Sequence, residues 1–237
     1  MNDLGVAIFG AGRAGHAHAR AISQTAGARL IAVFDADGEL GQPVFATDTW
    51  YKNFGLEGRL PWFLDRATGG GMWLMNGAHM LDRTCWVLDS EVASIRAWIG
   101  SPFHQLSADD ANLAFVQLRN GLHASIVHAG YRSRGVEKCE VEITCTDGML
   151  IFDSYSNRLA IERDGTYSPI YVQRVDPFTE ELKNLVGAIN GTETLRVSPA
   201  WGRHIVEVLL AAEESSRTGS EVTIKSSAPA VARRIGG

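Results

Sequence analysis

The chain opens on two apolar runs separated by a helix-like stretch. Residues 4–9 and 29–34 are short, apolar and contain β-branched residues, as buried strands do. Between them, residues 16–23 are rich in alanine and contain neither glycine nor proline, which favours a helix. The pattern therefore predicts a strand, a helix and a second strand at the start of the chain.

From residue 44 onward, apolar and polar residues alternate in short segments that are typical of strands. Asn120-Gly121, Asp147-Gly148 and Asp164-Gly165 lie between such segments and predict tight turns. We expect a largely antiparallel meander that ends in an edge strand. Its predicted strands are residues 44–50, 92–99, 111–118, 122–129, 140–144, 149–152, 159–162, 170–172 and 221–225.

Three helices are expected beside these strands. The first covers residues 72–88, after Gly69-Gly70-Gly71, with Thr68 as a candidate N-cap. Asp176 and Ser198 are the N-caps expected for the other two, because each is followed by proline. The apolar faces are Leu74, Ala78, Leu81, Cys85 and Leu88 in the first helix, Phe178, Leu182, Leu185, Val186 and Ile189 in the second, and Trp201, Ile205, Val208, Leu209 and Ala212 in the third.

A second stripe runs along the first of these helices. Met75, His79, Asp82 and Trp86 are each shifted by one residue from the apolar stripe, at the edge where a cleft could lie. His79 and Asp82 are three residues apart, so the carboxylate could orient the imidazole. His79 is also compatible with a half-buried structural histidine, and on residue chemistry alone that second interpretation is favoured.

The turn between the first two predicted strands carries a dinucleotide-binding motif. Gly10, Gly12 and Gly15 form G-x-G-x-x-G, with Ala11, Arg13 and Ala14 between them, and Asp35 ends the second strand. Backbone N–H groups at the start of the following helix bind phosphates, and the acidic residue accepts hydrogen bonds from the ribose hydroxyls. Asp35 would repel a 2′-phosphate, and Ala36 offers no cation. The sequence therefore predicts NAD in preference to NADP.

A complete dinucleotide-binding domain needs two β-α-β halves, and the second half is not found. After Asp35 no further alternation of apolar strands and long helices follows. We expect a partial dinucleotide-binding unit at residues 1–38, an α+β domain at residues 39–225 and a flexible tail at residues 226–237. The predicted fold is a truncated α/β Rossmann unit followed by an open, mainly antiparallel sheet backed by helices.

Composition and charge narrow the possible partners. The net charge is −5 and the pI is about 5.8, which does not favour nucleic acid or an anionic membrane surface. Cys85, Cys139 and Cys145 are odd in number and lack metal-ligand spacing, so we expect reduced thiols and no metal site. No charged, apolar signal segment opens the chain, and no apolar run is long enough to span a membrane. A cytoplasmic location is expected.

These motifs together resemble the Gfo/Idh/MocA oxidoreductases, the class named for glucose–fructose oxidoreductase and inositol dehydrogenase. The glycine loop with His18 resembles the opening of that family, and residues 41–44 resemble the entry to its substrate domain. The most specific match is the triple glycine followed by Gly77-x-His79-x-x-Asp82. Later matches are residues 147–150, Glu181-Leu182 and the helix after Ser198.

The resemblance implies hydride transfer between a sugar or polyol carbon and a nicotinamide. It also implies that a lysine of an E-K-P motif and an Asp and a His of the helix handle protons. His79 occupies the position of the catalytic His, whereas Met75 stands at the Asp position and the E-K-P lysine falls in the missing half. Glu137-Lys138-Cys139 does not replace that motif, because it enters a predicted strand.

Three interpretations remain open at this point. The chain is an oxidoreductase, or a non-catalytic remnant that binds sugars or oligomerises, or the product of an internal deletion in the gene. We expect Lys52, Asn76 and Asp82 to contribute to a polyol site, with Trp50, Tyr51 and Trp62 as further candidates. The open face of the predicted sheet indicates a homodimer or a higher homo-oligomer.

Overall fold

The computed structural model describes residues 4–9, 28–34 and 40–228, except for residues 133–134, 157, 164 and 171–175. The first two segments form a small parallel sheet of β1 (Leu4–Phe9) and β2 (Ala28–Phe34). The two predicted strands of the dinucleotide-binding unit are thus confirmed, and they pair in parallel. The predicted helix at residues 16–23 lies outside the described residues.

A second, larger sheet has nine strands in the order β10-β9-β8-β7-β3-β6-β5-β4-β11. All neighbouring pairs are antiparallel except β3 and β6, which run parallel. The expected open, mainly antiparallel sheet is confirmed. Its strands are β3 (Pro43–Asn53), β4 (Val92–Gly100), β5 (Ala111–Leu118), β6 (His123–Tyr131), β7 (Lys138–Cys145), β8 (Met149–Asp153), β9 (Arg158–Arg163), β10 (Thr166–Ile170) and β11 (Val222–Thr223).

One predicted strand is only partly described. The strand expected at residues 170–172 overlaps β10, at Thr166–Ile170, only at Ile170, and residues 171–172 lie outside the described residues. β10 pairs with β9 across the turn at Gly165. Gly165 has a φ of +75°, a conformation in which glycine is the favoured residue.

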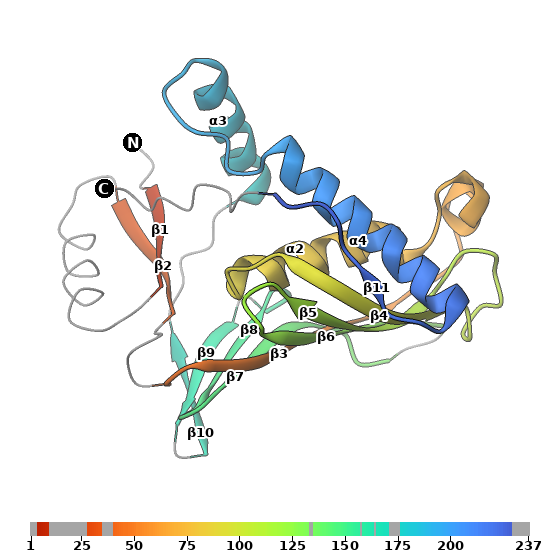
Figure 1. Cartoon of the computed structure of the whole chain (residues 1–237), viewed down its shortest axis with the longest axis horizontal. Coiled ribbons are helices and arrows are strands. Elements are labelled where there is room, and N and C mark those ends of the chain that lie inside the picture. The colour runs from red at the N-terminus through yellow and green to blue at the C-terminus, as the bar shows by residue number, and fades with distance from the viewer. Residues whose placement is uncertain are drawn as a thin grey trace.

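Helices cover one face of the large sheet (Figure 1). α2 (Ala78–Val87) and α4 (Pro199–Thr218) pack on this face, and their apolar residues form one core with the inward side chains of the strands. The Ser198 side chain accepts from the Trp201 N–H at 3.1 Å, which confirms the predicted cap of α4. None of the helices in the described part of the chain has the length and apolar character needed to cross a membrane.

The first predicted helix begins differently from expectation. It opens with the π-helix η3 (Trp73–Gly77), which continues into α2, and two 3₁₀ turns, η1 (Pro61–Leu64) and η2 (Arg66–Thr68), come before it. Thr68 does not cap it, because its hydroxyl donates to the Trp62 and Asp65 carbonyls within η1 and η2. Asp109 caps the helix instead, since its Oδ2 accepts from the Trp73 N–H at 2.7 Å.

The triple glycine before this helix has a packing reason. Gly71 has a φ of +118°, and a Cβ on it would lie 2.2 Å from Asp109 Oδ1. The loop can therefore approach the capping carboxylate only without a side chain. Asp109 is buried, and its burial raises the pKa to about 6 despite the hydrogen bond from the Trp73 N–H.

The Asp109→Asn variant should test this cap. A carboxyl whose pKa is raised by folding destabilises the fold as the pH rises from about 4 to about 6, here by roughly 2–3 kcal/mol. Asn cannot ionise and keeps an acceptor for Trp73, so the variant should gain stability relative to the unmodified chain over that range. Urea unfolding at pH 4.5 and pH 7 measures the difference, with the exposed Glu57→Gln as control. Equal differences at both pH values would show that Asp109 does not titrate as described.

Two parts of the C-terminal region differ from the sequence prediction. α3 (Pro177–Ile189) is capped by Asp176 as expected, but its apolar face is exposed, with Phe178 at 73% and Ile189 at 75%. The predicted flexible tail does not begin at residue 226. Ser226 and Ala228 are buried, and the Ser226 carbonyl accepts from Arg119 Nη2 at 3.0 Å. Residues 229–237 lie outside the described part.

Candidate functional site

The alternation of β3 places Asp48, Trp50 and Lys52 on the side of the sheet that carries the helices. The sheet register then sets His128 of β6 beside Trp50, and Asn112 of β5 beside His128. Three neighbouring strands thus bring acidic, aromatic, basic and amide side chains together. This cluster lies under the first helix, where the apolar core gives way to polar groups.

His128 is held between two amides. Its Nε2 lies 3.3 Å from Asn76 Nδ2 and its Nδ1 lies 3.2 Å from Asn112 Nδ2, and the side chain is 1% exposed. Burial, and then the charges of Lys52 and Arg83, lower the His128 pKa to about 3. The imidazole is therefore neutral near pH 7, so it is suited to fixed hydrogen bonding and not to proton transfer.

The tautomer of His128 follows from the hydrogen-bond inventory. A neutral imidazole has one N–H, so it cannot accept from both amide nitrogens. Asn112 Oδ1 is buried and lacks a partner when the amide nitrogen faces the ring. Turning this amide lets Oδ1 accept from Nδ1–H, while Asn76 Nδ2 donates to Nε2. We assign this arrangement because it gives both ring nitrogens a partner of the right kind.

Trp50 forms the aromatic surface of the cluster. Its ring lies 5.7 Å from that of His128, and its indole N–H donates to the Tyr155 hydroxyl at 2.6 Å. The Lys52 ammonium lies 5.2 Å and the Arg83 guanidinium 5.6 Å from the centre of the Trp50 ring. Aromatic faces, amides and cations are the groups that bind the apolar faces and hydroxyls of polyhydroxylated ligands.

A buried ion pair holds the helix to the sheet at this cluster. Asp48 is 0% exposed, and both of its carboxylate oxygens accept from the guanidinium of Arg83, one at 2.7 Å from Nε. Thr84 Oγ1 donates to the same carboxylate at 3.0 Å. Burial raises the pKa of Asp48, and Arg83 opposes that change. Burial lowers the pKa of Arg83, but the hydrogen bond and charge of Asp48 raise it overall.

Lys52 is the half-buried cation of the cluster. Its pKa is lowered to about 8, first by burial and then by the charge of Arg59. It therefore carries its proton at neutral pH but releases it more readily than an exposed lysine does.

The structure separates the residues predicted from the sequence. Lys52 and Asn76 lie in the cluster around His128. His79 is exposed on α2, and among the described residues no hydrogen bond joins it to Asp82, so the expected orientation of its imidazole by that carboxylate is wrong. Asp82 Oδ1 instead accepts from the Trp201 indole N–H at 2.6 Å, which ties α2 to α4. The predicted cofactor residues Gly10, Ala11, Gly12, Arg13, Ala14, Gly15 and Asp35 lie outside the described residues.

His128, Asn112, Arg83 and Asp48 were not identified from the sequence. The alternation Asp48-x-Trp50-x-Lys52 was a usable signal, because residues two apart in a strand share a face. Asn76 joins the cluster because the π-helical turn of η3 places it on the sheet side, where it is 9% exposed. Its neighbour Gly77 permits this turn, since a Cβ there would lie 2.6 Å from the Trp73 ring.

The small parallel sheet is compatible with a dinucleotide. Phe9 and Phe34 are in register at the carboxyl ends of β1 and β2. In the sequence the glycine loop follows Phe9 and Asp35 follows Phe34, and both lie outside the described residues. The carboxyl edge of the strands is where dinucleotides bind to such units. Among the described residues no group of His, Cys, Asp and Glu side chains could hold a metal ion, and the three cysteines are buried and form no disulfide with one another.

Solved structures share this fold at low sequence identity. An oxidoreductase from Agrobacterium radiobacter, in complex with NAD⁺, L-tartaric acid and magnesium, is 18% identical with a TM-score of 0.66, and the match covers 79% of this chain and 58% of that one. The aldose-aldose oxidoreductase of Caulobacter crescentus, complexed with glycerol, is 20% identical with a TM-score of 0.67, covering 79% and 57%. The WlbA dehydrogenase of Bordetella pertussis, with NADH and UDP-GlcNAcA, is 16% identical with a TM-score of 0.64, covering 79% and 56%.

The chain thus spans less than two thirds of the length of these structural relatives. Comparison with curated protein sequences gives no match. The sequence model of the GFO/IDH/MocA C-terminal domain matches residues 31–151, just over half of the chain. The fold of the large sheet and this match agree, and the chain belongs to the Gfo/Idh/MocA family.

Proposed function

We propose that this chain belongs to an NAD-dependent oxidoreductase that transfers a hydride to or from a sugar or polyol. The observation that carries the proposal is the cluster on the helix side of the sheet. There the Trp50 ring, the Lys52 ammonium and the Asn76 amide surround a neutral, buried His128. Structural relatives with NAD⁺ or NADH, and with glycerol or a nucleotide sugar, support the same class of cofactor and ligand.

The cofactor would be held by residues at the carboxyl edge of β1 and β2. Gly10, Gly12 and Gly15 would cradle the pyrophosphate, and Asp35 would bind the ribose, which favours NAD over NADP. The bound nicotinamide would supply hydride transfer. His79, exposed on α2, is the candidate for moving a proton at the substrate hydroxyl. Lys52 and Asn76 would position the substrate, while Asp82 has a structural role through Trp201.

A second candidate function is a sugar-binding or oligomerising module without catalysis. Two features favour it: Met75 stands where the family has an acidic residue, and the described part of the nucleotide-binding unit has only two strands. A positioned general base contributes roughly 10²–10⁴-fold to a rate, so the loss of catalytic groups should be evident in turnover.

Calorimetric titration with NAD, followed by turnover assays with a panel of polyols, distinguishes the two functions. The oxidoreductase proposal expects NAD binding that weakens in Asp35→Ala and persists in the exposed-carboxylate control Glu57→Ala. It further expects polyol oxidation that falls at least about tenfold in His79→Ala. Absence of binding at millimolar NAD would remove the proposal for this chain and leave the binding module.

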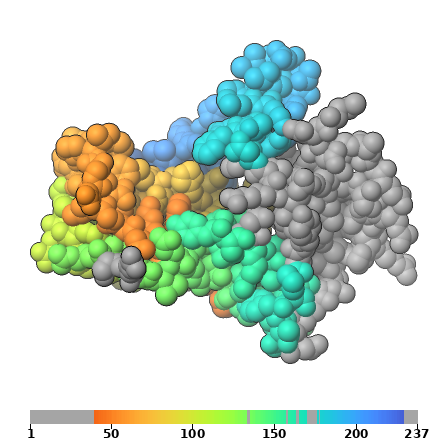
Figure 2. Space-filling model, turned by 180° about the vertical axis from the view of Figure 1, so that it is seen from behind, coloured from red at the N-terminus to blue at the C-terminus, as the bar shows by residue number. Residues whose placement is uncertain are grey.

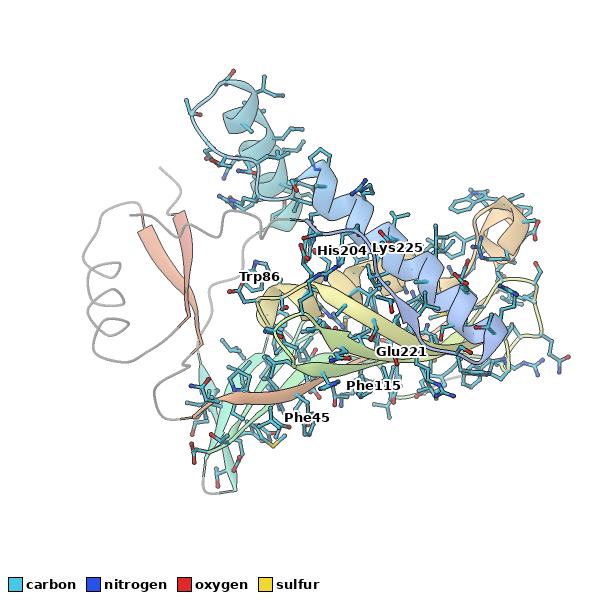
Figure 3. The ribbon with its side chains drawn as sticks, in the orientation of Figure 1. Phe45, Trp86, Phe115, His204, Glu221 and Lys225 are labelled. Carbon is cyan, nitrogen blue, oxygen red and sulfur yellow. The ribbon has the colours of Figure 1, made fainter. Side chains whose placement is uncertain are left out.

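We further propose that the open face of the large sheet forms a homodimer. Phe45, Trp98, Leu113 and Phe115 project from this face and are 45–55% exposed, and Phe45 and Phe115 lie on the side away from the helices in Figure 3. A shallow depression of about 330 Å³ is lined there by residues that include Arg96, Trp98 and Phe115. Exposed apolar patches of this kind mark interfaces between subunits.

The Phe115→Glu variant should convert the dimer to a monomer, because it places a charge at the centre of the apolar face. Light scattering at micromolar concentration gives the mass of each form. Phe178→Glu is the matched control, since Phe178 is as apolar and exposed but lies on α3. A monomeric unmodified chain, or a dimer that is lost only in the control, would contradict the proposed interface.

A further inference from the structure

Two cations beside the cluster rest on aromatic rings and not on carboxylates. The Lys52 ammonium lies 5.2 Å from the centre of the Trp50 ring and 6.0 Å from that of Phe54. The Arg59 guanidinium lies 4.0 Å from the same Phe54 ring and 4.9 Å from that of Phe63. Phe54 is 2% exposed, so the ring that both cations contact is fixed in the core.

Neither cation has an anionic partner among the residues that the structure describes. The Nε of Arg59 donates to the Gly55 carbonyl, and the ion pairs formed between described residues include neither Lys52 nor Arg59. The nearby Arg83 is different, because Asp48 neutralises it. Two like charges therefore lie close enough for Arg59 to lower the pKa of Lys52, and no carboxylate offsets them.

This arrangement is costly without a ligand. A half-buried ammonium loses hydration, and a neighbouring guanidinium repels it. Both costs are relieved when an anionic oxygen group binds between the two cations, because charge-assisted hydrogen bonds are the strongest that side chains form. The aromatic rings hold the cations in place before the anion arrives, which reduces the entropy lost on binding.

We propose that Lys52 and Arg59 form an anion subsite beside Trp50, so that the substrate is an acidic sugar or polyol carrying a carboxylate or a phosphate group. The inference rests on the proposed function, since it assigns a substrate class to the same site. Trp50 connects the subsite to His128: its ring lies 5.7 Å from the imidazole, tilted by 32°, and 5.2 Å from the ammonium of Lys52. The polyol part of the ligand would lie along this indole, with its acidic group at the two cations.

Calorimetry on the full chain without NAD tests the subsite directly. The probes are D-gluconate, D-glucose 6-phosphate and the uncharged D-glucitol. We expect at least one acidic probe to bind at least about tenfold more tightly than D-glucitol, because the neutral probe makes no charge-assisted contact. Comparison of the two acidic probes shows whether the subsite prefers carboxylate or phosphate.

Three variants separate the subsite from non-specific attraction. Lys52→Met and Arg59→Met should each weaken the preferred acidic probe by about tenfold or more and leave D-glucitol unchanged. Lys52→Arg should restore most of the binding, and Lys183→Met on α3 removes the same charge from an exposed ion pair as a control. Circular dichroism verifies that each variant is folded.

The inference is overturned if no acidic probe binds, if acidic and neutral probes bind equally, or if the control loses as much affinity as Lys52→Met. These results do not depend on NAD. A chain that binds gluconate through Lys52 but never binds NAD would refute the proposed oxidoreductase and leave the anion subsite standing. A chain that oxidises only neutral polyols would refute the anion subsite and leave the proposed oxidoreductase standing.

Discussion

Replacing Arg83 by methionine should destabilise the protein by about 3–5 kcal/mol at pH 7, the cost of leaving one partner of a buried ion pair alone. Asp48 is fully buried and receives hydrogen bonds from both Arg83 and Thr84. In the variant, Thr84 is the only one of these two hydrogen-bond donors to Asp48 that remains. Methionine keeps an apolar stem similar to that of Arg83, so the loss reports mainly on the charge and its hydrogen bonds.

A double-mutant cycle isolates this interaction. Asp48→Asn combined with Arg83→Met removes both charges, and the double variant should be more stable than Arg83→Met alone. Urea unfolding measures all four proteins. Lys183→Met, whose partner Glu180 lies on the same exposed helix, should cost no more than about 0.5 kcal/mol.

The pH dependence gives a second criterion. Burial raises the pKa of Asp48, and Arg83 is the only cation among the described residues that limits that change. A raised carboxyl pKa destabilises the fold as pH increases, so the penalty of Arg83→Met should shrink as the pH falls. A penalty below 1 kcal/mol at pH 7, or one that does not change with pH, would mean that water reaches Asp48 in the variant.

The strands could be predicted because each depends on local alternation. The pattern predicts β5 at the residues where it lies, since its side chains alternate between buried and exposed from Asn112 to Leu118. The turn at Asn120-Gly121 also follows from local chemistry, because Gly121 has a φ of +89°. Caps such as Ser198 are equally local. These features need no knowledge of which strands lie side by side.

The site depends on pairings that local patterns do not contain. β3 inserts between β6 and β7, and only this register sets Trp50 beside His128. The alternation within β3 or β6 does not reveal this pairing, because the two strands are far apart in the sequence and their pairing depends on the arrangement of the whole sheet. The π-helical turn of η3 is a further example: a uniform helical period assigns Asn76 to a different face from the one that it occupies.

The exposed face of α3 shows the limit of periodicity. Phe178, Leu182 and Ile189 do share a face, as the period predicts, but they remain exposed on a helix that projects from the end of α4 (Figure 1). The space-filling view shows the same projection from behind (Figure 2). Periodicity identifies which residues share a face, whereas the partner of that face depends on the rest of the assembly.

His128 should make the protein sensitive to acid. Its pKa is about 3 in the folded chain and 6.5 when exposed, so the fold binds fewer protons than the unfolded chain between those values. The stability that neutral His128 contributes is complete above pH 6.5 and is lost as the pH falls towards 3. The whole loss amounts to about 4–5 kcal/mol, which makes His128 a main determinant of acid unfolding.

The His128→Gln variant separates this contribution from other acid-sensitive groups. Glutamine cannot titrate, but it can still bond Asn76 and Asn112, so we expect a loss of about 1–3 kcal/mol at pH 7 and a flatter curve below pH 6.5. The two stability curves should converge and then cross as the pH decreases. Asp109 acts in the opposite direction between about pH 4 and pH 6, but it is present in both proteins and cancels in the difference.

Urea unfolding at half-unit steps from pH 7.5 to pH 4 measures this crossing. His79→Gln removes an exposed histidine and is the matched control, which should run parallel to the unmodified chain. If the His128→Gln curve also runs parallel, the imidazole must protonate inside the fold with its own counter-charge or water. The neutral tautomer, and with it the two-amide clamp of Asn76 and Asn112, would then be wrong. A crossing would establish that His128 stays neutral in the folded protein near pH 7, as the tautomer assigned between Asn76 and Asn112 requires.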